Sequence, residues 1–120
     1  MLYALICYDS EAVVNAWGKE KDDAVMANHI GEMRKIAAKG RLGPVARLMQ
    51  TSTATTLRPG RQALVLDGPF AETKEQLLGF YLVDCESLDE AINYGKKFMH
   101  ETGAIEVRPV QYFDTGSGGL

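Results

Sequence analysis

The chain has 120 residues, which is the size of one domain and is long enough to bury an ordinary hydrophobic core. Its 13 basic and 16 acidic side chains give a net charge of −3, and neither sign forms a long block, which argues against nucleic acid as the main partner. No apolar run approaches the roughly 18 residues that a membrane-spanning helix needs, so we expect no membrane contact.

The first predicted strand, residues 2–8, is apolar on both faces, which indicates burial on both sides. It lacks the basic start and the cleavage site of a signal peptide, so a cytoplasmic location is expected. Cys7 and Cys85 end apolar runs and form no C-x-x-C pair, and we interpret them as buried, reduced thiols. If their strands are antiparallel neighbours, the thiols lie roughly 20 Å apart, too far for a disulfide.

Two helices are predicted next: a short one over residues 11–17, capped by Ser10, and a longer one that Asp22 or Asp23 caps and that reaches Lys39. Apolar residues recur in the longer helix at i, i+4, i+7 and i+11, which makes one stripe that faces the sheet. His29 lies on a flank of this stripe, about 20° around the helix from Ile36. Its side chain is therefore expected to point toward the sheet.

The middle of the chain predicts a strand over residues 42–49 and then a hairpin formed by residues 55–58 and 62–67. The nonapeptide DGPFAETKE, residues 67–75, follows this hairpin and connects it to another apolar run. Its Gly-Pro pair stops the incoming strand, because proline has no N–H for the ladder. We expect Phe70, the only large apolar side chain in the loop, to fold back and anchor a charged binding rim.

The remaining elements complete a β-α-β, hairpin, β-α-β order. After a strand over residues 79–85, Ser87 and Glu90 predict a capping box that opens a helix, and Gly103 ends it. A last strand covers residues 105–112, and Pro109 within it indicates an edge or a bulge.

This order predicts an α+β fold of the ferredoxin-like, split βαβ type with an inserted β-hairpin. A single domain covers residues 1–113, and the Gly- and Ser-rich residues 114–120 are expected to form a flexible tail. A sheet with helices on one side leaves its other apolar face uncovered. We therefore expect a homodimer in which two sheets pack face to face.

The segment DGPFAETKEQLLGFYLVD, residues 67–84, resembles the signature of the DGPF-type proteins of the YCII-related family. Residues 53–58 and 105–110 resemble the same family, so the resemblance covers nearly the whole chain. It implies a dimeric α+β barrel, and it implies no shared reaction, since the family is recognised mainly by its fold. It also implies a proposed active site, because the pair His29-Ile30 looks like the helix histidine that is paired with an acid in the smaller YCII proteins.

His29 is accordingly the candidate general base, and Asp9, at the end of the first strand, is the candidate acid that orients the ring and raises its pKa. Each residue has a structural alternative. His29 would then be a half-buried histidine bonded to a backbone carbonyl, and Asp9 a strand-ending residue bonded to the next turn.

Five further residues are candidates for substrate binding: Asp67, Phe70, Glu72, Lys74 and Arg47. The first four belong to the loop after the hairpin, and Arg47 would hold an anionic group. As alternatives, Asp67 is an Asx-turn residue and the other charges form solvated ion pairs or surface charges. The chain has no glycine-rich nucleotide loop, and two His and two scattered Cys supply no zinc cluster, so neither a metal nor a cofactor is expected.

Two functions are compatible with these features, and a closed pocket in a protein with a purely structural role is a third, plainer alternative. The first is a small-molecule-binding enzyme that performs cofactor-free acid/base chemistry on a polar or aromatic metabolite, of the lyase, isomerase or dehydrohalogenase kind. The resemblance supports it through relatives linked to chlorinated aromatic intermediates. The alternative is a non-catalytic binding module with a sigma factor as partner, because genes for DGPF-type proteins tend to lie near those for sigma factors. The segment Pro44-Val45-Ala46 departs from the Gly-Gly-Glu that DGPF-type proteins commonly have.

Overall fold

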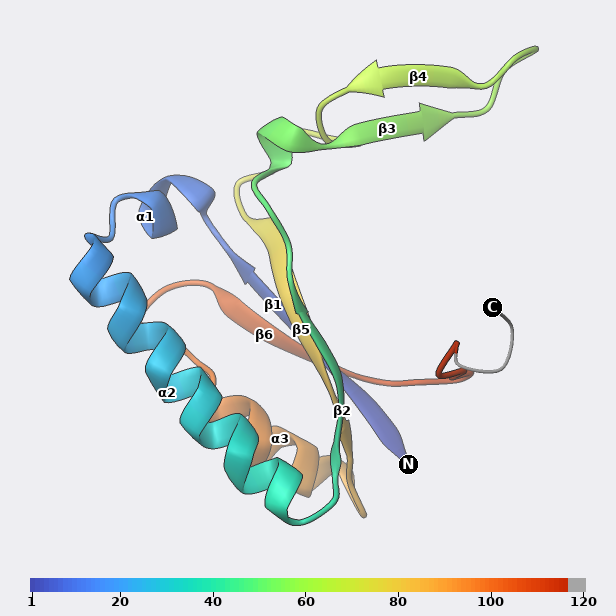
Figure 1. Ribbon diagram of the computed structural model, residues 1–120. Coiled ribbons are helices and arrows are strands. Elements are labelled where there is room, and N and C mark those ends of the chain that lie inside the picture. Colours follow the sequence, from blue (N-terminus) through green and yellow to red (C-terminus); the bar gives the residue numbers. More distant parts are fainter. Residues whose placement is uncertain (117–120) are drawn as a thin grey trace.

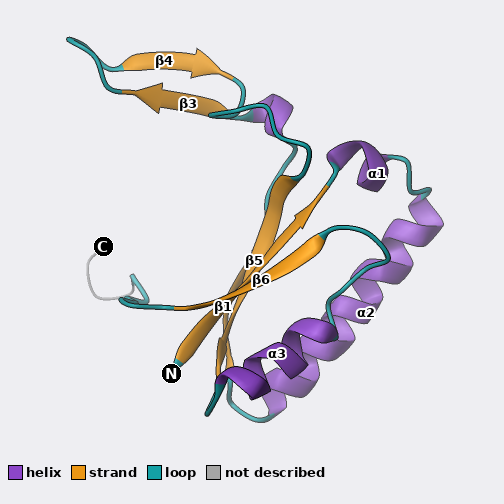
Figure 2. Ribbon diagram, turned by 180° about the vertical axis from the view of Figure 1, so that it is seen from behind, coloured by secondary structure: helices purple, strands orange, loops and turns teal. Residues whose placement is uncertain are grey.

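The computed structural model describes residues 1–116 (Figure 1). Four strands form the main sheet, a separate pair forms a hairpin, and the helices lie together on one side of the main sheet (Figures 1 and 2). The elements are, in chain order, β1 (Leu2–Asp9), α1 (Glu11–Asn15), α2 (Lys19–Ala38), β2 (Leu42–Arg47), the 3-10 turn η1 (Thr51–Thr53), β3 (Thr55–Arg58), β4 (Leu64–Asp67), β5 (Gln76–Asp84), α3 (Leu88–Lys96) and β6 (Ala104–Pro109).

The strands of the main sheet follow the order β2-β5-β1-β6, and every neighbouring pair is antiparallel. This order, with α2 and α3 on one face, confirms the predicted α+β, ferredoxin-like plan. The sheet is open at both edges within the single chain. Strands β1 and β5 are neighbours as predicted, and Cys7 and Cys85 are both free thiols at opposite ends of this pair.

The hydrophobic core lies between the sheet and the two long helices. Alternate residues of β1 and β5 point toward the helices, so Leu5 and Val83 are completely buried. Helix α2 contributes Ile36 to this layer, and the segment after α3 contributes Phe98. The same layer supports one wall of the cavity described below.

The two serine caps are confirmed, since Ser10 Oγ accepts from the N–H of Val13 and Ser87 Oγ accepts from the N–H of Glu90. The carboxylate of Glu90 accepts from Nη1 of Arg41 at 2.9 Å instead of reaching back to the start of its own helix. The N-cap of helix α2 is Gly18 and not Asp22 or Asp23, so the helix begins earlier than predicted, at Lys19.

Several predicted ends were misplaced. Helix α3 ends at Lys96, well before Gly103, and the following residues form the loop that carries the candidate site. Strand β5 begins at Gln76, because a bulge opposite Cys7 and Tyr8 lets its first residues keep pairing with β1. Strand β6 ends at Pro109. The last four residues of the predicted tail lie outside the described residues.

Within residues 1–116, no helix combines the length and the apolar character that crossing a bilayer requires.

The hairpin β3–β4, residues 55–67, is called the arm below. It extends from one end of the main sheet, toward the side opposite α2 and α3 (Figures 1 and 2). The radius of gyration is 16.2 Å, whereas a compact chain of this length has about 14 Å, because the arm projects from the body. The prediction that Phe70 folds back and anchors its loop is wrong, because its side chain is 70% exposed.

Substitution of Gly79 tests the close approach of strands β5 and β2. A Cβ at this position would lie 2.2 Å from the carbonyl oxygen of Ala46 on the neighbouring strand β2. We expect Gly79→Ala to lower the free energy of unfolding by about 1–3 kcal/mol, because two backbones would have to separate. Gly31→Ala is the matched control, since a Cβ there meets nothing within 4 Å and alanine favours helix α2 by about 1 kcal/mol. Urea denaturation would measure both, and an unchanged Gly79 variant would contradict the expectation.

Candidate functional site

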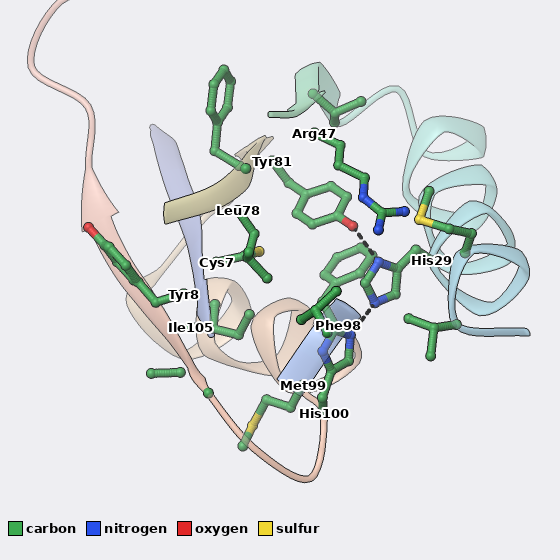
Figure 3. Close-up of a pocket in the computed structure, with 18 of the residues that line it drawn as sticks. Cys7, Tyr8, His29, Arg47, Leu78, Tyr81, Phe98, Met99, His100 and Ile105 are labelled. Carbon is green, nitrogen blue, oxygen red and sulfur yellow. Dashed lines mark hydrogen bonds between the residues drawn. The ribbon is translucent and has the colours of Figure 1, made fainter. Parts of the chain in front are cut away.

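A cavity of about 210 Å³ lies between α2, the sheet and the loop that follows α3 (Figure 3). Most of its wall is apolar, and the polar groups gather where α2 meets the sheet. The side chains that line it include Asp22, His29, Arg47, Tyr81, Phe98 and His100.

Three side chains from distant parts of the sequence form one hydrogen-bonded chain in this cavity (Figure 3). His29 of α2 lies at its centre and is 8% exposed. Its Nδ1 is 2.8 Å from the hydroxyl of Tyr81 on β5. Its Nε2 is 3.0 Å from Nε2 of His100, in the loop after α3.

This chain can carry its protons in either direction. In one arrangement Tyr81 donates to Nδ1 of His29, and the Nε2–H of His29 donates to His100. In the other, His100 donates to Nε2 of His29, whose Nδ1–H donates to the Tyr81 oxygen. The second arrangement frees the hydroxyl proton of Tyr81 to point elsewhere. Converting the first arrangement into the second moves one proton across each bond, and it also requires the Tyr81 oxygen to gain a proton and His100 to lose one from Nδ1.

Burial keeps both histidines neutral near pH 7. It lowers the pKa of His29 to about 4, with smaller contributions from His100 and Arg47. Burial also lowers the pKa of His100, although the charge of Asp9 opposes this shift. The pKa of the Tyr81 hydroxyl is raised, mainly by burial. The chain therefore consists of neutral groups whose charged forms are all disfavoured.

Aromatic rings hold this chain in place. Phe98 stacks on the Tyr81 ring at a centroid distance of 4.1 Å and meets the edge of His29 at 5.5 Å. Trp17 makes an edge contact with His100 at 5.2 Å. His100 and Trp17 also line a second hollow, between α1, α2 and the loop after α3. His100 is thus the member of the chain that lies between the cavity and the outer surface.

Asp9 does not orient His29 as predicted. Both ring nitrogens of His29 are bonded to other groups, and the Asp9 carboxylate accepts from the Ser10 N–H at 2.7 Å and from the Thr102 hydroxyl at 2.9 Å. The predicted rise in the pKa of His29 is also wrong, because burial lowers it. Asp9 instead fixes the loop next to His100. Gly103, at φ +80°, lets this loop approach the end of β1.

Of the five predicted binding residues, Arg47 alone lines this cavity. Its Nη2 donates to Asp22 Oδ1 at 3.0 Å, and both side chains are partly exposed. Asp67 ends strand β4, and Phe70, Glu72 and Lys74 lie in the exposed loop that follows. The predicted binding rim is therefore not part of this cavity: the loop follows the arm, which leaves the main sheet on the side opposite α2 and α3 (Figures 1 and 2).

Sequence reasoning identified neither His100 nor Tyr81 as a site residue. His100 follows α3 in a loop, where no periodicity indicates the direction of a side chain. The available signal was that His100 is one of two histidines in the chain, near the end of the helix that Gly103 was predicted to terminate. In the part of the chain that the structure describes, no three His, Cys, Asp or Glu side chains gather into a possible metal site.

Comparison with known proteins supports one family over almost the full length. Residues 1–114 match the YCII-related domain. The chain is also 51% identical, over 120 aligned residues, to an uncharacterized protein of Rhizobium meliloti (strain 1021), and the alignment covers 97% of both chains.

Proposed function

The chain belongs to the YCII-related family, and we propose that its cavity binds a small, largely aromatic molecule and catalyses proton transfer without a cofactor. The observation that carries this proposal is the chain of Tyr81, His29 and His100, which ends in an apolar cavity. Neutral imidazoles accept protons, and placing them beside a sheltered ligand is the usual arrangement for general acid/base catalysis.

The lining of the cavity indicates the class of ligand. Its volume of about 210 Å³ suits one substituted ring rather than a nucleotide-sized molecule. Among the described residues that line it, Arg47 is the one permanently charged cation, and it stands close to His29 and Tyr81 (Figure 3). Arg47 would bind a carboxylate or stabilise an enolate as negative charge develops on the ligand.

The proton path starts at the Tyr81 oxygen. As the C–H bond of the ligand breaks, its electron pair stays on the ligand and its proton goes to this oxygen. The hydroxyl proton of Tyr81 passes to Nδ1 of His29, and the Nε2 proton of His29 passes to Nε2 of His100. The ligand becomes an anion and His100 an imidazolium. Elimination reactions and isomerisations both begin with this step.

Asp9 has a different role from the one predicted. Its charge raises the pKa of His100, so it favours the imidazolium formed at the end of the path. Its hydrogen bond to Thr102 holds the loop that presents this ring. We therefore assign His29 and His100 as the acid/base pair and Asp9 as a positioning residue.

Solvent exchange tests the proposal. Phenylpyruvate is a suitable first probe, because it combines one ring, a carboxylate and an acidic C–H group. We expect the protein to accelerate exchange of its methylene protons in D₂O, measured by NMR. His29→Gln and Tyr81→Phe should each slow the catalysed exchange by about 100-fold or more, since both interrupt the path.

Asn28→Gln is the matched control, because Asn28 is the exposed neighbour of His29 on α2 and should leave the exchange rate unchanged. Binding is followed separately through chemical-shift changes of the Phe98 and His29 rings. Binding with equal exchange in the wild type and in His29→Gln would refute proton transfer. Failure of phenylpyruvate and of a panel of small aromatic acids to bind would refute the ligand class.

A further inference from the structure

An ion pair lies at the edge of the cavity, beside the hydrogen-bonded chain. Nη2 of Arg47 donates to Oδ1 of Asp22 at 3.0 Å, and both residues line the cavity. The side chain of Arg47 is 50% exposed and that of Asp22 is 35% exposed, so the pair lies where the cavity meets solvent. Asp22 has no part in the path of protons from Tyr81 to His100, and its role is still to be explained.

Regular secondary structure brings the two residues together. Asp22 lies in the first turn of α2, about two helical turns before His29, so both side chains lie on the same face of this helix. Arg47 is the last residue of the edge strand β2, opposite Gly79 of β5. Because Gly79 has no side chain, the two strand backbones stay close at this point. The positions of both charges are therefore set by the scaffold.

The pair leaves most of the hydrogen-bonding capacity of Arg47 unused. A guanidinium has several N–H donors in a planar fork, and the contact that the structure shows for it within residues 1–116 is the single bond to Asp22. A single-bonded pair with this exposure contributes little to stability, because water screens it and because both side chains lose freedom when it forms. Exchanging the carboxylate of Asp22 for another carboxylate therefore costs little free energy.

The start of α2 stabilises the carboxylate of Asp22 once it leaves Arg47. The N-cap of this helix is Gly18, which provides no side-chain hydrogen bond, so the partial positive charge of the first N–H groups is not compensated by a capping side chain. A negative charge in the first turn is favourable in this field. Asp22 thus has a favourable environment in both positions, bonded to Arg47 and released from it.

We propose that Asp22 is a specificity-determining residue, which occupies Arg47 until the carboxylate of an aromatic ligand replaces it. This inference rests on the proposed function, in which Arg47 binds that carboxylate. An anion without a ring exchanges one carboxylate for another and gains little free energy. A ligand whose ring also enters the apolar cavity gains the burial of that ring. Competition by Asp22 therefore excludes small free anions and admits aromatic acids.

Three unreactive probes separate the contribution of the charge from that of the ring. The probe 3-phenylpropanoate has both groups, propanoate has the carboxylate alone, and 3-phenylpropan-1-ol has the ring alone. We expect Asp22→Asn to bind 3-phenylpropanoate about 10-fold more tightly than the wild type, because the amide competes for Arg47 without a charge. The Kd of 3-phenylpropan-1-ol should change by less than about 2-fold. Propanoate should bind measurably to Asp22→Asn and not to the wild type. Calorimetric titration measures each Kd.

Asp23→Asn is the matched control, because it removes the same charge from the next residue. Asp23 pairs with Lys19 at 3.6 Å and does not line the cavity, so all three Kd values should stay unchanged. A second comparison uses Arg47→Met, in which the cation is absent. Adding Asp22→Asn to this variant should change the Kd of 3-phenylpropanoate by less than about 3-fold, because Asp22 acts through Arg47.

Equal affinity of the wild type and Asp22→Asn for 3-phenylpropanoate would overturn the inference. So would binding of propanoate to the wild type as tightly as to Asp22→Asn, or failure of Asp22→Asn to bind 3-phenylpropanoate. The proton path is judged separately, by the exchange of phenylpyruvate protons in the wild type. A tighter 3-phenylpropanoate complex in Asp22→Asn, together with no catalysed exchange in the wild type, would support the role of Asp22 and refute proton transfer.

Discussion

Replacing Phe98 with alanine is expected to lower the free energy of unfolding by about 3–5 kcal/mol. Phe98 is 1% exposed, stacks on Tyr81 and contacts His29 by its edge. Removing the ring would open a void between the core and the cavity, and the sheet on one side and α2 on the other are too rigid to fill it. Urea denaturation followed by circular dichroism measures this loss.

Met99→Ala is the matched control for this substitution. Met99 is the next residue in the chain but is 59% exposed, so its truncation should change stability by less than about 0.5 kcal/mol. A loss below about 1 kcal/mol in Phe98→Ala would show that the ring does not belong to the core. Equal losses in both variants would show that the loop after α3 matters more than the packing of Phe98.

Acidification from pH 6.5 to pH 4 is expected to remove up to about 3 kcal/mol of stability through His29 alone. The folded state holds the pKa of His29 at about 4, whereas an unfolded histidine has a pKa near 6.5. Between these values the unfolded chain binds the additional proton, so stability falls as the pH falls. Above pH 6.5 the full contribution is present, and below pH 4 it is lost.

The variant His29→Gln separates this effect from acid unfolding by carboxylates. Its stability should fall less than that of the wild type between pH 6.5 and pH 4, and the difference between the two curves is the contribution of His29. NMR titration of the His29 ring gives the pKa directly. A His29 pKa at or above 6.5 would contradict the burial described here and would restore a charged partner such as Asp9.

The features that the sequence predicted correctly are those that depend on residues close together in the chain. Ser10 and Ser87 cap helices because a hydroxyl reaches an N–H three residues away in any context. Short apolar runs identify the strands, and the order of elements identifies the ferredoxin-like sheet. The position of His29 on the sheet-facing side of α2 also follows from helical periodicity.

The partners of His29 depend on packing between segments that are far apart in sequence. Tyr81 and His100 are 52 and 71 residues away from it, so no spacing rule connects them. The predicted pairing of Asp9 with His29 is wrong for the same reason. Strand β1 ends near the loop after α3, where the carboxylate of Asp9 accepts hydrogen bonds from Thr102 and Ser10. A buried polar group bonds to whichever partners the packing places beside it.

The arm shows most clearly which features the local sequence specifies and which depend on tertiary structure. The residue pattern from Thr55 to Asp67 is sufficient to specify a hairpin and its turn, because strand pairing and turn chemistry are local. Its direction is a property of the assembled chain, set by the closing contacts at Gly68 and by the strands from which it leaves. That direction removes Asp67 and its loop from the cavity and leaves Arg47 within it, because a side chain's surroundings depend on the placement of whole elements.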